Sequence, residues 1–398
     1  MTAHTHSLET QAHERFDVTS RHRIVAIAGS LTAIAVATTG FASTASASHL
    51  PVPIANGTYV VPFENPTNVA GSSTAVQGIK GADLLGTYYI VGTNWPNGFV
   101  YEGAINQGAI TPGSGVGTWT QFNVPSSWGV QDSSPYGVAN LNGVDVAIVG
   151  SWNTGTVVNS FYYQGPVTST PKASDFTSVT AISPRNNEPA DYTILHSVMG
   201  GLVVGNYDFN NDKNPAGNAF IYNPTTGAQT PITYPKHYRA FTHTAYGIWW
   251  NGGTSYTITG GQSRARSKIT KGHDGKPIGD ATMIDYDSAS GKFSHFKMFS
   301  YPNTHNKKNS PISHFEGIWS NGDGTYRMPS LAVTHRGVVG GIATVKRLAN
   351  GHFSNAKWRQ LDVPNSKAIT TNNSIYGKVS IGVSDVNGSI VPYAFQQR

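Results

Sequence analysis

Apolar and polar residues alternate along this chain in short stretches that are separated by turn residues. The clearest stretch runs from Thr242 to Gly261, where an apolar segment, an Asn-Gly turn and a second alternating segment follow one another. Alternation with a period of two is typical of a half-buried strand, and Asn-Gly favours the tight turn of a hairpin. The stretch therefore predicts a β-hairpin.

This hairpin pattern recurs along the chain, with a small residue at the same position of the first strand in each copy. Six copies can be recognised, and these small residues are Gly78, Gly137, Ser197, Gly247, Gly317 and Gly377. Such a repeat predicts one array of similar β-units, although 398 residues would otherwise be enough for two domains. The 44 glycines and the low charged fraction of 12% agree with an all-β protein that has many turns.

The two ends of the array complement each other. Residues 57–66 form a lone strand without a hairpin partner, and this strand ends in proline like the last strand of the later units. The final unit supplies only three strands before the chain ends. An N-terminal strand that completes the C-terminal unit would remove the open edges, as in β-propellers. The sequence therefore predicts an all-β, six-bladed β-propeller, with blades that begin near residues 74, 133, 193, 243, 313 and 373.

One segment also resembles a known family. Ala219-Phe220-Ile221-Tyr222, followed by residues 242–260, is similar to the HAF-type extracellular repeat of secreted bacterial proteins. The resemblance extends over most of residues 57–398, although the units here are longer. It implies a secreted β-repeat protein, and it implies no particular activity because a repeat fold can host many functions.

The first 47 residues have the pattern of a signal peptide. Basic residues at Arg21 and Arg23 precede an apolar run over residues 24–41, and Ala45-Ser46-Ala47 suits cleavage before Ser48. An uncleaved anchor is the alternative, which the sequence disfavours because the run is rich in Ala, Thr and Gly and only barely long enough to cross a bilayer. We expect residues 48–398 to form a single exported, monomeric domain that does not contact the membrane once the signal is removed.

The charge distribution points to an anionic partner. The net charge is +6, and the second half of the chain carries the surplus of Lys and Arg. Many of these residues fall in segments that would share one face of a propeller, including the insertion 262–278. A basic face attracts anionic polymers, and export makes a nucleic acid an unsuitable partner. We therefore expect an anionic polysaccharide or cell-surface glycan.

The residue before each repeat position suggests a site on the axis. These residues are Gln77, Tyr136, His196, Tyr246, Glu316 and Tyr376, and they form a polar ring in the predicted propeller. Two positions earlier the same side presents His314 in the fifth unit. One interpretation is a structural plug of mutually bonded polar groups. The other is a ligand site, which the chemical variety at one repeated position favours.

A catalytic ring of this composition suits β-elimination on a uronic-acid polymer. His196, or Tyr136, would act as base and Tyr246 as acid. We expect Lys236, Arg239 and Lys308 to neutralise the substrate carboxylate, and Trp95 and Trp152 to stack on sugar rings. Gln77 and Tyr376 would bind substrate beside them. The alternative is a propeller that binds carbohydrate without cleaving it.

Other chemistries are less well supported by the sequence. Glycoside hydrolysis normally needs two facing carboxyl groups, and Glu316 is the only acid in the ring. Asp208, Asn210 and Asp212 place oxygen ligands at alternate positions, as at the start of a calcium loop, but Lys213 replaces the glycine of that pattern. Calcium is therefore a possible ion, with an Asn/Asp-rich turn as the alternative. The absence of cysteine excludes thiolate chemistry.

Overall fold

The structure is a computed structural model, and it describes residues 51, 53–54, 56–64, 74–105, 117–155, 157–209, 218–235, 240–264, 279–302, 313–334 and 337–398. These residues form an all-β protein in which two short 3-10 turns, η1 (Ser126–Trp128) and η2 (Ala173–Asp175), are the only helical segments. None of the described helices is long and apolar enough to cross a membrane. The predicted signal segment 1–47 lies outside the described residues.

Antiparallel ladders divide the described strands into six successive sets. Set 1 contains β2 (Thr74–Gly81), β3 (Thr87–Asn94), β4 (Asn97–Ala104) and β5 (Gly117–Gln121). Set 2 contains β6 (Asp132–Asn140), β7 (Asp145–Asn153), β8 (Val158–Pro166) and β9 (Phe176–Val179). Set 3 contains β10 (Tyr192–Met199), β11 (Leu202–Asp208), β12 (Asn218–Tyr222) and β13 (Gln229–Pro231).

The later sets follow the same order with more interruptions. Set 4 contains β14 (Ala240–Gly252), β15 (Ser255–Arg264), β16 (Gly279–Asp287) and β17 (Lys292–Phe299). In set 5, β18 (Ser313–Phe315) and β19 (Trp319–Ser320) both pair with β20 (Thr325–Thr334), followed by β21 (Gly337–Lys346) and β22 (Lys357–Gln360). In set 6, β23 (Ser366–Thr370) and β24 (Ser374–Tyr376) both pair with β25 (Val379–Val386), followed by β26 (Ser389–Gln397).

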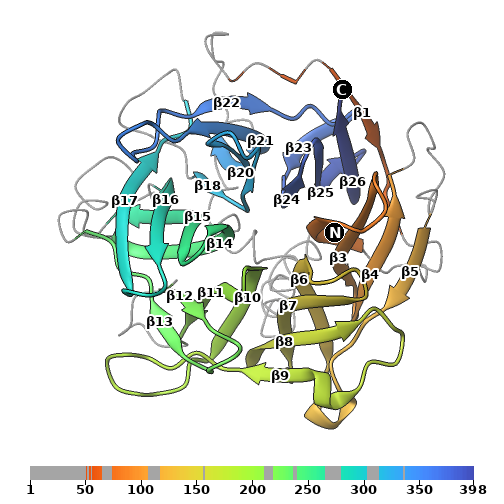
Figure 1. Ribbon diagram of the computed structural model, residues 1–398. Coiled ribbons are helices and arrows are strands. Elements are labelled where there is room, and N and C mark those ends of the chain that lie inside the picture. Colours follow the sequence, from red (N-terminus) through yellow and green to blue (C-terminus); the bar gives the residue numbers. More distant parts are fainter. Residues whose placement is uncertain are drawn as a thin grey trace, which may run out of the picture.

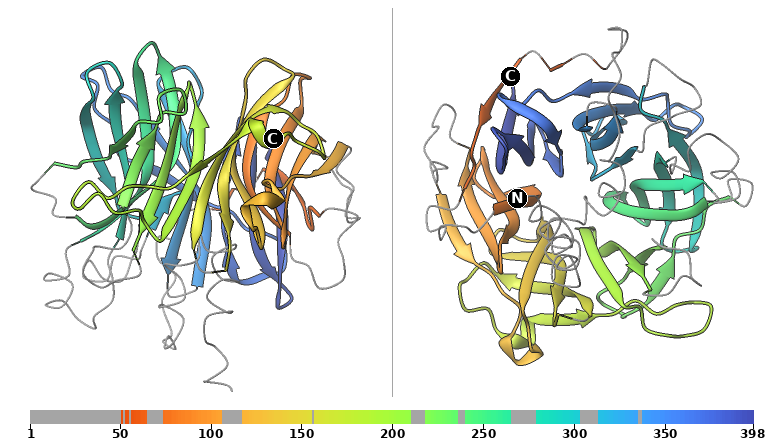
Figure 2. Two further views of the ribbon diagram at one scale, coloured as in Figure 1. Left: turned by 90° about the horizontal axis from the view of Figure 1, so that it is seen from below. Right: turned by 180° about the vertical axis from the view of Figure 1, so that it is seen from behind.

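The N-terminal strand β1 (Gly57–Val60) pairs with the last strand of the chain. Its ladder with β26 is antiparallel, with Tyr59 opposite Phe395. The predicted pairing of these two segments is therefore observed. Figure 1 shows the sets arranged around a common centre, with the first strands innermost and β1 beside β26. Seen from the side, the strands run from one face of the molecule to the other (Figure 2).

The hydrophobic core lies between neighbouring sets, because each sheet has apolar side chains on both of its faces. For example, Val91 of set 1 packs in one cluster with Ile148 of set 2. The first and last sets share a cluster of the same kind, in which Val76 and Ile79 lie with Ile381. Burial of both faces explains why continuous apolar runs, such as 146–149, occur in the second strands.

Candidate functional site

The ring positions of sets 1 to 4 lie at one-residue β-bulges. The ladder between the first and second strands skips one residue in each of these sets, and the skipped residues are Gln77, Tyr136, His196 and Tyr246. A bulge leaves its extra residue out of the ladder and redirects its side chain. The same backbone irregularity therefore presents three kinds of side chain, Gln, Tyr and His, at four equivalent places.

Glycines in the second strands make these bulges possible. Gly92, Gly150, Gly205 and Gly260 lie opposite the residue that precedes each bulge. A Cβ at any of them would lie closer than 3.0 Å to the carbonyl oxygen two residues before the bulged side chain. Only glycine admits such a close approach of two backbones. The second-strand glycines are thus needed for the bulges that form the ring.

The ring position of set 6 differs from the one predicted. Ser374 pairs with Ile381, and the Asn373 N–H donates to the Ile381 carbonyl at 2.8 Å. A Cβ at Gly382 would approach the carbonyl of Thr371, two residues before Asn373. Asn373 is therefore the counterpart of the bulged residues, and Tyr376 lies three residues further along the chain. The prediction that Tyr376 belongs to the ring is wrong in register, because the sequence pattern matched Gly377 instead of Ser374 to the repeat glycine.

The small residues after the bulges allow the first strands to approach one another. A Cβ at Gly137 would lie 2.5 Å from the carbonyl oxygen of His196, and one at Gly247 would lie 2.7 Å from Gly317. Between the last and first sets, the Ile79 N–H donates to the Ser374 hydroxyl at 3.3 Å. These contacts bring the neighbouring bulged residues together at the centre.

Four rings and a carboxylate form a continuous row across sets 2 to 5, which we call the axial arc. The ring centroids of Tyr136 and His196 lie 5.1 Å apart, and those of His196 and Tyr246 lie 4.6 Å apart at 84°. Tyr246 then contacts the His314 ring at 5.2 Å, and His314 Nε2 lies against Glu316 Oε1. The structure thus brings together the predicted residues Tyr136, His196, Tyr246 and Glu316.

His314 is a member of the arc that the sequence analysis did not select. The available signal was its position, two residues before Glu316 on the same side of the strand. Gln77 and Asn373 occupy the ring positions of sets 1 and 6, and the Asn373 amide donates to the Val76 carbonyl at 2.7 Å. Asn373 therefore links the last set to the first at the level of the ring.

Burial sets the protonation states of the central pair. It lowers the pKa of His196 to about 3, and the neighbouring His314 acts in the same direction. Burial also raises the pKa of Tyr246 well above its usual value, with a further contribution from the carboxylate of Glu316. At neutral pH His196 is therefore a neutral imidazole and Tyr246 a protonated phenol. Tyr246 is 9% exposed, and His196 is half-buried.

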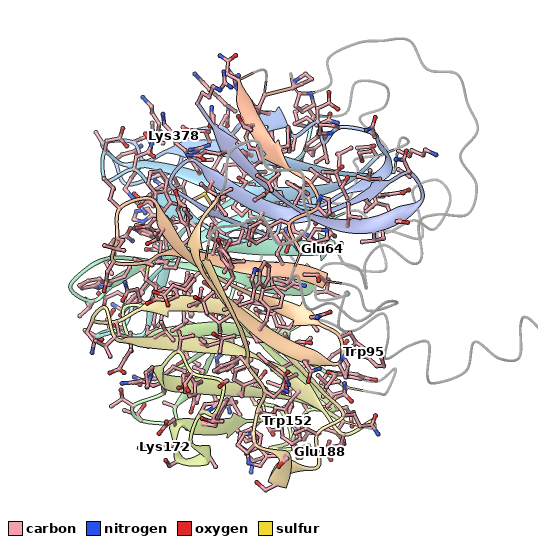
Figure 3. The ribbon with its side chains drawn as sticks, turned by 90° about the vertical axis from the view of Figure 1, so that its right-hand side faces the viewer. Glu64, Trp95, Trp152, Lys172, Glu188 and Lys378 are labelled. Atoms are coloured by element: carbon pink, nitrogen blue, oxygen red, sulfur yellow. The ribbon has the colours of Figure 1, made fainter. Side chains whose placement is uncertain are left out.

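The two tryptophans predicted to stack on sugars lie in different environments. Trp95, in the turn between β3 and β4, is 41% exposed, whereas Trp152 is 7% exposed and packs in the core against Trp128. The Trp152 indole donates to the Ser160 carbonyl at 3.3 Å. Figure 3 shows Trp95 at the edge of the ribbon. The stacking role predicted for Trp152 is wrong, because its ring fills the space between sets 1 and 2.

Several predicted site residues lie outside the described residues. These are Lys236, Arg239 and Lys308 of the predicted basic face, and Asn210 and Asp212 of the predicted calcium loop. Asp208 is described, and its carboxylate accepts from the Phe209 N–H at 2.7 Å. Within the described ranges, no group of three or more His, Asp or Glu side chains is arranged to hold a metal ion.

The chain was also compared with known proteins. No protein-family model matches it, and no curated protein matches its sequence. Among solved structures it is similar to an ulvan lyase, a polysaccharide lyase, with 9% identity, a TM-score of 0.40 and 85% of each chain covered. It is also similar to an endo-arabinase from Bacteroides thetaiotaomicron, with 10% identity, a TM-score of 0.33, and 88% of this chain and 98% of the other covered. Similarity this low identifies neither a family nor an activity.

Proposed function

We propose that the chain is a six-bladed β-propeller in which each strand set is one blade. The pairing of β1 with β26 supports this reading, since an N-terminal strand then forms the outer edge of the last blade. The shared cluster of sets 1 and 6 and the Asn373–Val76 hydrogen bond support it as well. In this arrangement the axial arc surrounds the propeller axis.

We further propose that the axial arc cleaves an anionic polysaccharide by β-elimination. The observation that carries this proposal is the contact between a neutral histidine, His196, and a protonated tyrosine, Tyr246. Elimination needs a base that removes the proton beside the uronate carboxyl group and an acid that protonates the departing glycosidic oxygen. His196 is in the state that accepts a proton, and Tyr246 is in the state that donates one.

The bonds and protons of this reaction balance without any further reactant. The C–H electron pair forms a carbon–carbon double bond in the sugar ring as the bond to the leaving oxygen breaks, and that oxygen takes the tyrosine proton. Transfer of a proton from His196 to Tyr246 then restores both side chains, either directly or through water. A carboxylate bound beside His196 would raise the pKa of His196 by charge attraction and make it a stronger base.

The test is a screen for unsaturated uronate products, which absorb in the ultraviolet. The purified protein is incubated with polygalacturonate, alginate and a glucuronate-containing polysaccharide. We expect Tyr246→Phe and His196→Gln to lower the rate on the active polymer by about 10²–10⁴-fold, the usual contribution of a general acid or base. Tyr162→Phe is the matched control, because the Tyr162 hydroxyl contacts Gln164 on an outer part of its sheet. If no polymer yields the unsaturated product, the lyase proposal fails.

The second candidate is a propeller that binds anionic carbohydrate without cleaving it. The burial of the arc favours this reading, because Glu316 is 8% exposed and His314 6% exposed, as in a packed polar core. Salt-sensitive retention on an anionic polysaccharide, without cleavage, would be the expected result. Glycoside hydrolysis is less suited, since Glu316 is the only carboxyl group in the described arc and lies against His314.

Export is part of the proposal, and it rests on the sequence of residues 1–47. The expected partner is an extracellular polysaccharide or cell-surface glycan, and the expected form is a monomer. Mass spectrometry of the N-terminus of secreted protein would test the cleavage, which we expect before Ser48.

A further inference from the structure

A second layer of side chains lies three residues beyond the ring. Counting from each ring position gives Lys80, Ala139, Met199, Trp249, Trp319 and Tyr376. This layer contains large apolar and aromatic residues where the ring contains polar ones. Three residues of extended strand span about 10 Å. The layer therefore lies beyond the axial arc, on the side of the turns that join the first and second strands.

Lys80 crosses this layer. Its Nζ lies 3.6 Å from Met199 Sδ, 5.0 Å from the centroid of the Trp249 ring and 5.8 Å from the centroid of the Tyr376 ring. These partners come from sets 3, 4 and 6, whereas Lys80 comes from set 1. A single ammonium group thus contacts side chains from three other sets, so it must lie close to the common centre.

The partners are held in place by their own contacts. The Trp250 N–H points to Met199 Sδ at 3.5 Å, and Tyr376 packs against Tyr88 with ring centroids 6.3 Å apart. A Cβ at Gly81 would lie 2.6 Å from the Tyr376 ring, so this ring also abuts the backbone of set 1. Two of the three partners of the ammonium group, Met199 and Tyr376, are therefore positioned by contacts with other residues.

The Lys80 ammonium has no anionic partner among the described residues, since none of their ion pairs includes it. Cation–π contacts offset part of the lost hydration. Burial still lowers the pKa of Lys80 to about 8. An anion that reached the ammonium group would therefore gain a charge interaction in a poorly hydrated place, where such interactions are stronger than in water.

We propose that the Lys80 ammonium is the receptor for an anionic oxygen group, carboxylate or sulfate, of a carbohydrate chain that enters along the axis. The inference rests on the proposed function, because the axial arc would hold the neighbouring part of the same chain. It assigns the preference for acidic over neutral glycans to a residue at the centre. Lys80 would recognise the acidic group that reaches the axis.

The first test measures the reactivity of Lys80 in the wild-type protein. Acetic anhydride labelling at a series of pH values, with mass spectrometry of each lysine peptide, gives the fraction of free amine. Galacturonate and inorganic sulfate are the two probes. Because a rise of one pKa unit lowers the free amine about tenfold, we expect a saturating anion to slow acetylation of Lys80 about tenfold. Lys378, which is exposed on the face opposite Trp95, is the internal control (Figure 3).

The two probes separate the two kinds of group. Protection by galacturonate alone assigns the receptor to carboxylates, and protection by sulfate alone assigns it to sulfates. Equal acetylation with and without both anions overturns the proposal, even if a polysaccharide binds elsewhere. If the anions protect Lys80 but no polysaccharide binds, the proposed function fails and the anion receptor stands.

The second test compares Lys80→Met with Lys378→Met. Methionine is an unbranched side chain one atom shorter than lysine, and it removes the charge. We expect Lys80→Met to weaken binding of the acidic polymer about tenfold or more, without changing binding of its methyl-esterified, neutral form, whereas Lys378→Met should behave as wild type. Unchanged affinity of a folded Lys80→Met protein for the acidic polymer would refute the inference. If this variant does not fold, the labelling of the wild-type protein decides.

Discussion

Gly260→Ala tests whether the second-strand glycines hold the ring in place. Gly260 pairs with Ala245, the residue before the bulged Tyr246. A Cβ at position 260 would lie 2.7 Å from the carbonyl carbon of Thr244, closer still to its oxygen, and 3.0 Å from the Cα of Ala245. All three are backbone atoms, so no side-chain rotation can relieve the clash. The first two strands of set 4 must therefore separate at the bulge.

The magnitude follows from the size of this separation. Ordinary contact of a Cβ begins near 3.4 Å, so the Thr244 carbonyl carbon must move by about 0.7 Å and its oxygen by more. Overpacking of this kind costs about 1–3 kcal/mol, and a lost ladder hydrogen bond adds about 1 kcal/mol. The lower entropy of unfolded alanine returns about 0.4–1 kcal/mol. We expect a net loss of about 1–3.6 kcal/mol in the free energy of unfolding.

Urea unfolding, followed by circular dichroism, measures this loss, with Gly317→Ala as the matched control. A Cβ at Gly317 would meet Pro329 side-chain atoms at 3.3 and 3.8 Å, so the control should change stability by less than about 1 kcal/mol. The displaced bulge should also move Tyr246 away from His196 and lower any activity of the arc. A loss below about 1 kcal/mol in Gly260→Ala, or an equal loss in the control, would refute the reasoning.

Three further predictions concern charge and pH. Arg347 donates two hydrogen bonds to Asp285, at 2.7 and 2.8 Å, and so joins set 5 to set 4. Arg347→Met should therefore lower the free energy of unfolding, measured in urea, by about 3–5 kcal/mol. A loss of less than about 1 kcal/mol would contradict a structural role. Burial lowers the pKa of His196 to about 3 and that of His243 to about 4. Below pH 6.5 the unfolded chain therefore binds more protons than the folded protein, so the free energy of unfolding should fall between about pH 6.5 and 4. This fall should be shallower in His243→Gln. Since free His196 is neutral down to about pH 3, kcat/KM of the proposed lyase should show no acid limb near pH 6.5, and such a limb would exclude His196 as the base.

Much of the fold could be predicted because each copy of the repeat contains the residues that determine its strands and its turn. Strand alternation and Asn-Gly turns indicated hairpins, and the lone strand near residue 60 indicated a pairing with the tail of the chain, which β1 and β26 form. Five positions of the ring, residues 77, 136, 196, 246 and 316, were predictable because a small residue follows each of them. The bulges themselves were not predicted, because a one-residue insertion in a ladder leaves no pattern beyond that small residue.

The failures come from places where the local pattern had two readings. In set 6 the glycine pattern fitted Gly377, but that glycine, at φ 58°, forms the turn between β24 and β25, and Ser374 takes the packing position. Trp152 lies near the end of β7, and Trp95 follows the end of β3, yet Trp128 of η1 covers Trp152. Such cover depends on a neighbouring set, and strand periodicity within one set cannot show it.

The bulge explains how one backbone frame can hold different chemistry in each set. A ladder residue is restricted on both faces by neighbouring sheets, as the buried Leu195 and Ala245 are, so its size and polarity cannot vary freely. A bulged residue is released from that restriction and needs only a small residue after it and a glycine opposite the residue before it. His196 and Tyr246 could therefore differ without any change in the surrounding core. The repeat thus restricts the backbone of the site far more than its chemistry, which is why the axial arc has to be tested residue by residue.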